Sequence, residues 1–174
     1  DIDMSAMTTW TAIVNAPPYT KGIDFNGNDR VISNFTCNTG AYRSFFGVLN
    51  GKCHNVTFDK ASVDATVNSN ETCAAIISAY GGNKDEIVAD IQDVHISGTV
   101  KGNGKASSYI GFGGAVGMAV NTVLKRVSAD VSVSATSRAI GGLVGCQRIS
   151  KAGNYLTIED CWSSGTISGS QQVG

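Results

Sequence analysis

Apolar and polar residues alternate with a period of two through five short segments of the chain. These segments are VISNFTC (31–37), CHNVTFDKASVDATV (53–67), IQDVHISGTVKGNG (91–104), LKRVSADVSVSAT (124–136) and IEDCWSSGTISGS (158–170). A period of two puts successive side chains on opposite faces, as in a β-strand, and no window carries an apolar stripe of helical spacing. A polar residue precedes an inward-facing position in each segment, at Asn34, Asn55, Asp93, Arg126 and Asp160. The pattern predicts an all-β protein built from a recurring strand.

A second motif, rich in glycine and alanine, follows each of the first four segments. Its copies are FFGVLNG (45–51), AAIISAYGG (74–82), FGGAVGMA (112–119) and IGGLVGC (140–146). Aligned on the residue before the aliphatic pair, they place Gly47, Ala75, Gly114 and Gly142 together, 28, 39 and 28 residues apart. Repeats of this length are typical of stacked architectures, and small residues let one coil approach the next. We therefore expect a parallel β-solenoid (β-helix) of about four to five coils, right-handed as parallel crossovers usually are.

The two ends of the chain differ from the repeats. Residues 1–22 contain Trp10 and both prolines, so we expect them to cap the first coil, with TTWTAIV (8–14) as a strand. Residues 23–174 form the repeat region, which stops at SGSQQVG (168–174), in the middle of a repeat. Native solenoids cap their open strand edges. We therefore expect further repeats or another chain to cover this end.

Composition removes several classes of function. The chain has 174 residues, a formal net charge of −1 and only 16% charged residues, which gives no basic face for nucleic acid. No apolar run is long enough to span a bilayer. The five cysteines contain no CxxC pair, so we expect no zinc site and mostly buried free thiols. A single disulfide, for instance between Cys53 and Cys73, is left open.

A polar cluster near the start resembles a calcium loop at first sight. It contains Asp24, Asn26, Asn28 and Asp29. Counted from Asp24, however, the sixth residue is Asp29 where an EF-type loop needs glycine, and the twelfth is Phe35 where it needs glutamate. Asn-Gly followed by Asn-Asp is instead typical of a turn. We predict a turn, and no metal site or cofactor in the chain.

Candidate catalytic groups are few. His54 and His95 are the only histidines, and no nucleophile elbow of the G-x-S-x-G type occurs. Asp93 and Asp160 occupy equivalent positions, but Arg126 should lie between them and keep these carboxylates too far apart for glycoside hydrolysis. The acidic run NKDEIVADIQD (83–93) is expected to be a solvated loop or short helical turn. We expect no catalytic residues.

Aromatic residues at or near the predicted turns are the best candidates for ligand binding. Aromatic faces stack against sugar rings and contribute strongly to protein interfaces. The candidates are Trp162, Tyr109, Tyr155 and Tyr42. The tyrosines could equally cover the core with their hydroxyls in water.

The motifs IGGLVG (140–145), FGGAVG (112–117) and DCWSSGTISG (160–169) together resemble the GLUG-motif repeats of bacterial surface proteins. IDFNGNDRVISNFTC (23–37) is similar to the segment that opens such arrays. The resemblance covers residues 20 to 174 and implies a β-helical module. It also implies an extracellular, cell-surface or periplasmic location, in some cases with a lipid anchor in the outer membrane. It supplies no catalytic residue.

These observations together predict a non-enzymatic module of a secreted or surface protein, acting in adhesion or as a structural spacer. Its loops at 83–90, 103–109 and 147–156 would present side chains to a partner, either a protein or a glycan of a host or bacterial surface. The alternative is a carbohydrate-binding or carbohydrate-cleaving β-helix domain.

Overall fold

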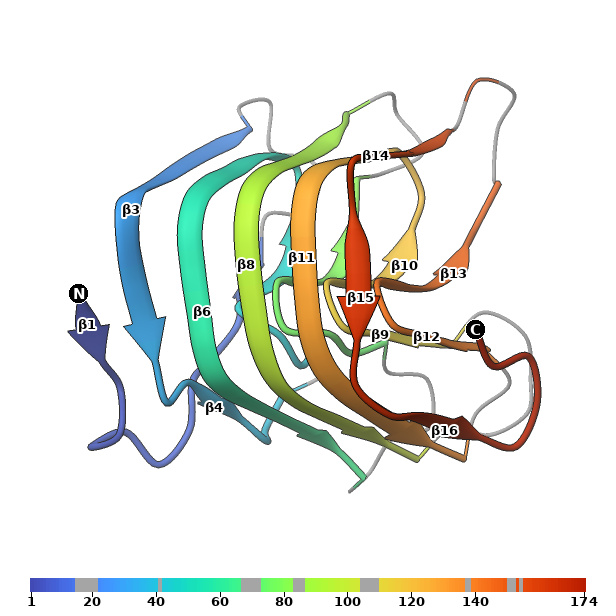
Figure 1. Ribbon diagram of the computed structural model, residues 1–174, viewed down its shortest axis with the longest axis horizontal. Coiled ribbons are helices and arrows are strands. Elements are labelled where there is room, and N and C mark those ends of the chain that lie inside the picture. Colours follow the sequence, from blue (N-terminus) through green and yellow to red (C-terminus); the bar gives the residue numbers. More distant parts are fainter. Residues whose placement is uncertain are drawn as a thin grey trace.

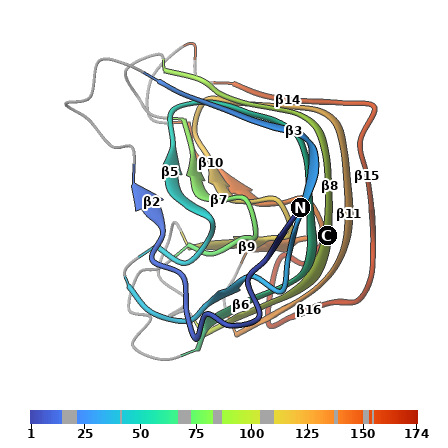
Figure 2. The same ribbon diagram turned by 90° about the vertical axis from the view of Figure 1, so that its left-hand side faces the viewer.

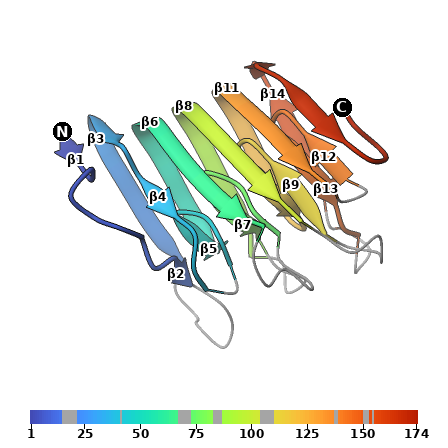
Figure 3. The same ribbon diagram turned by 90° about the horizontal axis from the view of Figure 1, so that it is seen from below.

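The computed structural model describes residues 1–14, 22–40, 42–66, 73–82, 87–103, 110–136, 139–149, 153 and 155–174. These described residues form β-strands and no helix, and every strand pairing among them is parallel. The strands lie side by side along the long axis, from the N-terminus at one end to the C-terminus at the other (Figures 1 and 3). This confirms the prediction of an all-β fold with parallel sheets, the arrangement of a β-helix or solenoid.

The largest sheet contains long strands that bend. Its order is β1 (Ile2–Asp3), β3 (Ile23–Ser33), β6 (Gly51–Ala65), β8 (Ala89–Gly102), β11 (Thr122–Ala135) and β14 (Leu156–Glu159). β4 (Thr36–Cys37) also pairs with β6, and β15 (Trp162–Ser164) and β16 (Ile167–Gly169) also pair with β11. Viewed along the axis, β8 and β11 pass around three sides of the cross-section (Figure 2).

The remaining side is closed by strands from the glycine-rich motifs. A second sheet contains β2 (Ile13–Val14), β5 (Phe46–Leu49), β7 (Ser78–Gly81), β10 (Val116–Ala119) and β13 (Val144–Gln147). A third sheet pairs β9 (Gly111–Gly113) with β12 (Ala139–Gly141). A Cβ atom on Gly113 would lie 2.1 Å from the Val116 carbonyl oxygen, and one on Gly114 would lie 2.2 Å from the Gly142 carbonyl oxygen. The small residues are therefore required for close backbone approach, as predicted.

The polar residues of the repeated strand form a corner. Asn55, Asp93, Arg126 and Asp160 all have φ values of 52° or 53°, in the left-handed region. They are aligned across neighbouring strands, because the pairs on either side, such as Gln92 with Lys125, are in register. The repeated polar position thus marks where each long strand bends, a conformation that favours asparagine and aspartate.

Asn34 does not belong to this corner, contrary to the sequence alignment. Its N–H donates to the Asp59 carbonyl at 2.9 Å, which aligns it with Lys60 in the next corner along the chain. Asn34 and Lys60 also have positive φ values, 58° and 53°. Because both corners of a coil use left-handed residues, a polar residue in the sequence does not reveal which corner it occupies. The first corner of β3 is instead formed by Asn28 and Asp29.

The alignment of the glycine-rich motifs needs a similar correction. Val116 pairs with Val144, as expected from the alignment of Gly114 with Gly142. In the second motif, however, Val116 aligns with Ser78, one residue away from the expected Ile77. In the first motif it aligns with Phe46, three residues away from the expected Leu49. The expectation was wrong because Phe45 and Phe46 supply the apolar pair of the first motif. Gly47 and Ala75 are therefore not equivalent to Gly114.

The interior is made of stacked columns of side chains, one residue from each coil. One column contains Phe25, Cys53, Ile91, Leu124 and Ile158, and another contains Cys37, Val63, Val100, Val133 and Ile167. Most of these side chains are fully buried. All five cysteines are free thiols, so the disulfide left open between Cys53 and Cys73 does not form.

The N-terminal segment lies against the first coil. Trp10 stacks on Phe45 with ring centroids 4.9 Å apart, and its indole N–H donates to the Phe45 carbonyl at 3.0 Å. Of the expected strand 8–14, only Ile13 and Val14 are in a strand, while β1 pairs with β3. The described part of the chain contains no helix of a length and hydrophobicity that would cross a membrane.

Candidate functional site

The predicted ligand-binding aromatics have different surroundings. Trp162 begins β15 on the outer face and is 54% exposed, so it lies in a strand and not in a turn. Tyr155 precedes β14 and is 44% exposed. Tyr42 is half-buried and packs edge-to-face on Tyr80, with ring centroids 5.4 Å apart. Tyr109 lies outside the described residues. Among the described residues, no ring contact joins Trp162, Tyr155 and Tyr42.

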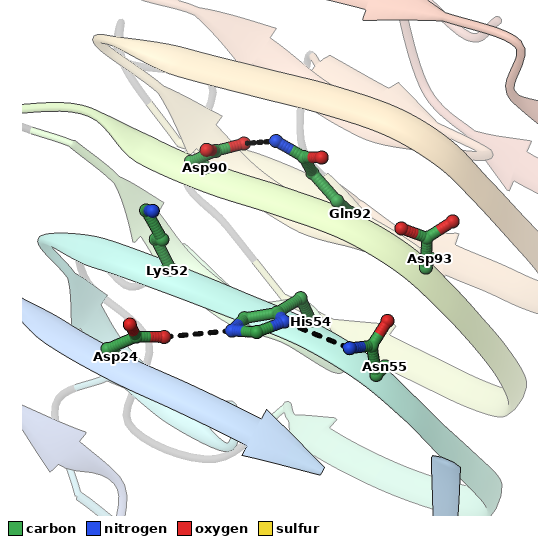
Figure 4. Close-up of a pocket in the computed structure, with 7 residues that line it drawn as sticks. All are labelled: Asp24, Lys52, His54, Asn55, Asp90, Gln92 and Asp93. Carbon is green, nitrogen blue, oxygen red and sulfur yellow. Dashed lines mark hydrogen bonds and ion pairs between the residues drawn. The ribbon is translucent and has the colours of Figure 1, made fainter. Parts of the chain in front are cut away.

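A polar hollow lies on the outer face of β3, β6 and β8 (Figure 4). It encloses about 220 Å³ and is lined by Asp24, Lys52, His54, Asn55, Asp90, Gln92 and Asp93. The strand register explains its composition, since Lys52 pairs with Asp24 on one side and with Asp90 on the other. One cationic side chain is therefore flanked by two carboxylates from neighbouring coils.

Both ring nitrogens of His54 are engaged in this hollow. Nε2 is 2.8 Å from Asp24 Oδ1, and Nδ1 is 3.2 Å from the Asn55 amide nitrogen (Figure 4). The amide group of Asn55 can only donate through that nitrogen, so Nδ1 accepts and Nε2 carries the proton that it donates to Asp24. An imidazole held in this way has no free nitrogen to act as a general base.

The other edge of the hollow is occupied by two further interactions. The Gln92 amide donates to Asp90 at 2.7 Å, and the Arg126 guanidinium holds Asp93 through Nε and Nη2 at 2.5 and 2.6 Å. The hydrogen bonds from Arg126 lower the pKa of the Asp93 carboxyl. Arg126 also aligns with Asp160 on the following strand, so it separates the two aspartates as predicted.

The loop or helical turn predicted for the acidic run is wrong at Ala89 and Asp90, while residues 91–93 lie in the strand predicted for 91–104. Residues 89–93 are the start of strand β8, while residues 83–86 lie outside the described part of the chain. The reason is that Ala89 and Ile91 point inward into the stacked columns, which fixes Asp90 and Gln92 on the outer face. The sequence carried this signal as a short alternation before Asp93.

The hollow can receive a polar ligand, because hydrogen-bonding groups line it.

The predicted turn at Asn28 and Asp29 is confirmed as a bend within β3. Both residues have positive φ values, and the Asn28 N–H donates to the Asn26 side chain at 2.9 Å. The strand register shifts at this point relative to β6. Within the described residues, no group of three or more histidine, cysteine, aspartate or glutamate side chains could hold a metal ion.

A second group of side chains lies around the corner on the outer face. His95 of β8, Ser128 of β11 and Trp162 of β15 are aligned in successive coils. His95 Nδ1 is 2.8 Å from Ser128 Oγ, and the His95 ring centroid is 6.5 Å from that of Trp162. We name these three residues the outer-face platform.

The serine–histidine pair of the platform lacks the rest of a hydrolytic site. A catalytic triad needs a third group that orients the base, together with donors aimed at a developing oxyanion. Among the described residues the His95 ring is hydrogen-bonded to Ser128, and no carboxylate is bonded to it. All three side chains lie on the outer face of a sheet, with His95 and Trp162 exposed. The hydrogen bond between Ser128 and His95 fixes the orientation of the His95 ring.

Comparison with known proteins gives one informative result. No family model matches the chain, and no curated protein sequence matches it either. A crystal structure of a protein from Bacteroides ovatus, described as a "putative immunoglobulin A1 protease", superposes with a TM-score of 0.80 at 31% sequence identity. The match covers 100% of this chain and 53% of that protein. The chain therefore spans about half the length of the protein whose fold it shares.

Proposed function

We propose that the chain is a non-enzymatic repeat module of a secreted or cell-surface bacterial protein, related to the GLUG-motif repeats, that acts in adhesion or as a spacer. We propose four to five coils of right-handed winding. The observation that carries the proposal is the parallel pairing of β6, β8 and β11 over nearly their whole length, with one register shift between β6 and β8 and none between β8 and β11. Such a ladder of parallel strands is stiff, and it holds outward side chains at a spacing of about 4.8 Å per coil.

The two ends have different roles in this proposal. Residues 1–22 act as the cap of the first coil, which is supported by the stacking of Trp10 on Phe45. The last coil is covered by further repeats or by another chain, which is supported by exposed Ile158 and Val173. Unpaired strand edges are otherwise sites of uncontrolled association.

The name of the structural neighbour raises protease activity as the competing function. The Ser128–His95 pair is the arrangement to test, since it is a hydroxyl within hydrogen-bond distance of an imidazole. Incubation of the purified chain with human immunoglobulin A1, followed by electrophoresis, is expected to leave the antibody intact. Cleavage that disappears in Ser128→Ala would replace the module proposal with an enzymatic one.

Surface location is tested on the cells that produce the protein. An antibody against the purified chain should label intact cells, and a protease added outside should remove the label. Labelling only after the cells are permeabilised would contradict the proposed location. Adhesion is then separated from a spacer role by measuring binding of the chain to immobilised mucin and to matrix proteins.

A further inference from the structure

We propose that the outer-face platform of His95, Ser128 and Trp162, together with Asp130 and Ser164, is a binding site for a neutral oligosaccharide. The inference rests on the proposed function, because it gives the ligand class for a module that displays side chains to a surface. A sugar ring would pack on the indole of Trp162. Its hydroxyl groups would bind the carboxylate and hydroxyls beside it.

The aromatic part of the site is exposed and rigidly placed. Trp162 is 54% exposed, although large apolar side chains are costly to leave in water. It lies in strand β15, and its backbone is paired with Ser128 of β11. The face of an indole carries negative charge density and attracts the C–H groups on the apolar face of a pyranose ring. The small Ser128 side chain leaves room for the ring beside it, while His95 adds a second ring 6.5 Å away.

The polar part of the site lies two residues further along the same strands. Because side chains alternate, residues two apart share one face, so Ser164 and Asp130 lie on the face of Trp162 and Ser128. The Ser164 hydroxyl donates to Asp130 Oδ1 at 2.9 Å, and the Ser97 hydroxyl donates to Asp59 Oδ1 at 2.8 Å. Each carboxylate keeps lone pairs that can accept further hydrogen bonds from sugar hydroxyls.

The charges around the platform favour neutral ligands over acidic ones. The cationic side chains of Lys125 and Arg126 are bound to Glu159 and Asp93, and Lys60 Nζ lies 3.9 Å from Asp59 Oδ2. Asp130 and Asp59 point outward beside the platform with serine partners. Among the described residues no ion pair engages Asp130, so a uronate or sialate carboxylate placed beside it would meet its negative charge, which costs affinity.

The site is pre-organised, which reduces the entropy lost on binding. His95 is oriented by Ser128, and Asp130 is oriented by Ser164. The side chains stand on paired strands and not on loops, so their spacing is fixed before a ligand arrives (Figure 1, β8, β11 and β15).

The test uses cellohexaose, chitohexaose and mannohexaose as neutral probes and hexagalacturonate as the acidic probe. The chain is titrated with each probe by calorimetry and by tryptophan emission. We expect at least one neutral probe to bind and to shift the emission of Trp162. We also expect Trp162→Ala to lower the association constant at least tenfold, Trp162→Phe to lower it less, and Asp130→Ala to lower it several-fold.

Tyr155→Ala is the matched control, because Tyr155 is also an exposed aromatic but precedes β14, whereas Trp162 follows the corner at Asp160. It should leave the association constant unchanged. Absence of binding to all three neutral probes, equal binding by Trp162→Ala, or tighter binding of hexagalacturonate would overturn the inference. Surface labelling of the producing cells does not depend on Trp162, so failure of this site is distinguishable from failure of the module proposal.

Discussion

Inward-facing side chains are covered at the N-terminal end of the stack but partly exposed at the C-terminal end. At the N-terminal end, Trp10 stacks on Phe45 at an interplanar angle of 8°, and Met4 is buried against the same core cluster. At the C-terminal end, Ile158 is 49% exposed, although its column neighbour Leu124 on the preceding strand is fully buried. In a stacked fold, burial of a side chain is therefore decided by whether another coil or a cap lies on it.

The two ends also differ in the kind of side chain they contain. The first coils hold a cluster of aromatic rings, with Phe45 in contact with five others. The column that begins with Ile32 and Phe58 ends with Ala129 and then with an exposed serine, Ser163. Large rings bury more apolar area for each residue, so we expect stability to be concentrated near the N-terminus.

The largest expected effect comes from removing the centre of the aromatic cluster. Phe45→Ala should lower the free energy of unfolding by about 3–5 kcal/mol, because it leaves a cavity among buried rings. Ile158→Ala at the other end should cost less than about 1 kcal/mol, since its side chain is half in water. Urea unfolding followed by circular dichroism measures both changes. Equal losses at the two ends would contradict the difference between them.

Thiol reactivity gives a second comparison between the two ends. Burial raises the pKa of the Cys53 thiol to about 12, whereas Cys161 lies partly exposed in the last coil. Between pH 7 and 9 we expect iodoacetamide to modify Cys53 at least about a hundredfold more slowly than Cys161, since the thiolate is the nucleophile. Peptide mapping by mass spectrometry measures the rate at each cysteine. In 8 M urea the two rates should become similar, and similar rates in the native protein would refute the prediction.

Removing the N-terminal cap should have a smaller effect on stability. Trp10→Ala should lower the free energy of unfolding by about 2 kcal/mol, because Trp10 is only partly buried but also donates a hydrogen bond. Trp162→Ala is the matched control, and it should change stability by less than about 0.5 kcal/mol because its side chain lies on the outer face. Chemical unfolding followed by circular dichroism compares the two variants. A Trp10 effect as small as the Trp162 effect would argue against a capping role.

The smallest expected effect is at a corner between the ends. Lys60 has a φ of 53° and an exposed side chain, and Asn34 occupies the aligned corner on the preceding strand. Lys60→Asn should stabilise the protein by about 0.5 kcal/mol, since asparagine tolerates the left-handed region better than lysine. Lys60→Ala removes the same charge without that tolerance and should give no gain. A gain in both variants would assign the effect to charge and not to the backbone.

Some parts of the candidate sites were predictable and others were not. Trp162 could be selected from the sequence as an aromatic near a predicted turn, although the structure places it within strand β15. Its neighbour His95 could not be selected from the sequence, because His95 and Trp162 lie 67 positions apart in the chain. They are brought together only because each is aligned with Ser128 on the strand between them. The Asp24–His54 contact was missed for the same reason, since it depends on the register between β3 and β6.

The sequence by itself determined the strand alternation, the parallel stacking of repeats and the need for small residues where backbones approach. Those features are encoded locally, by period-two patterning and by glycine at fixed positions. The tertiary structure alone decided which corner Asn34 occupies, how the first two glycine-rich motifs align, and which outward side chains meet. The reason is that extra residues at the bends of β3 and β6 shift the register between coils, and contacts across coils follow the register and not the sequence pattern.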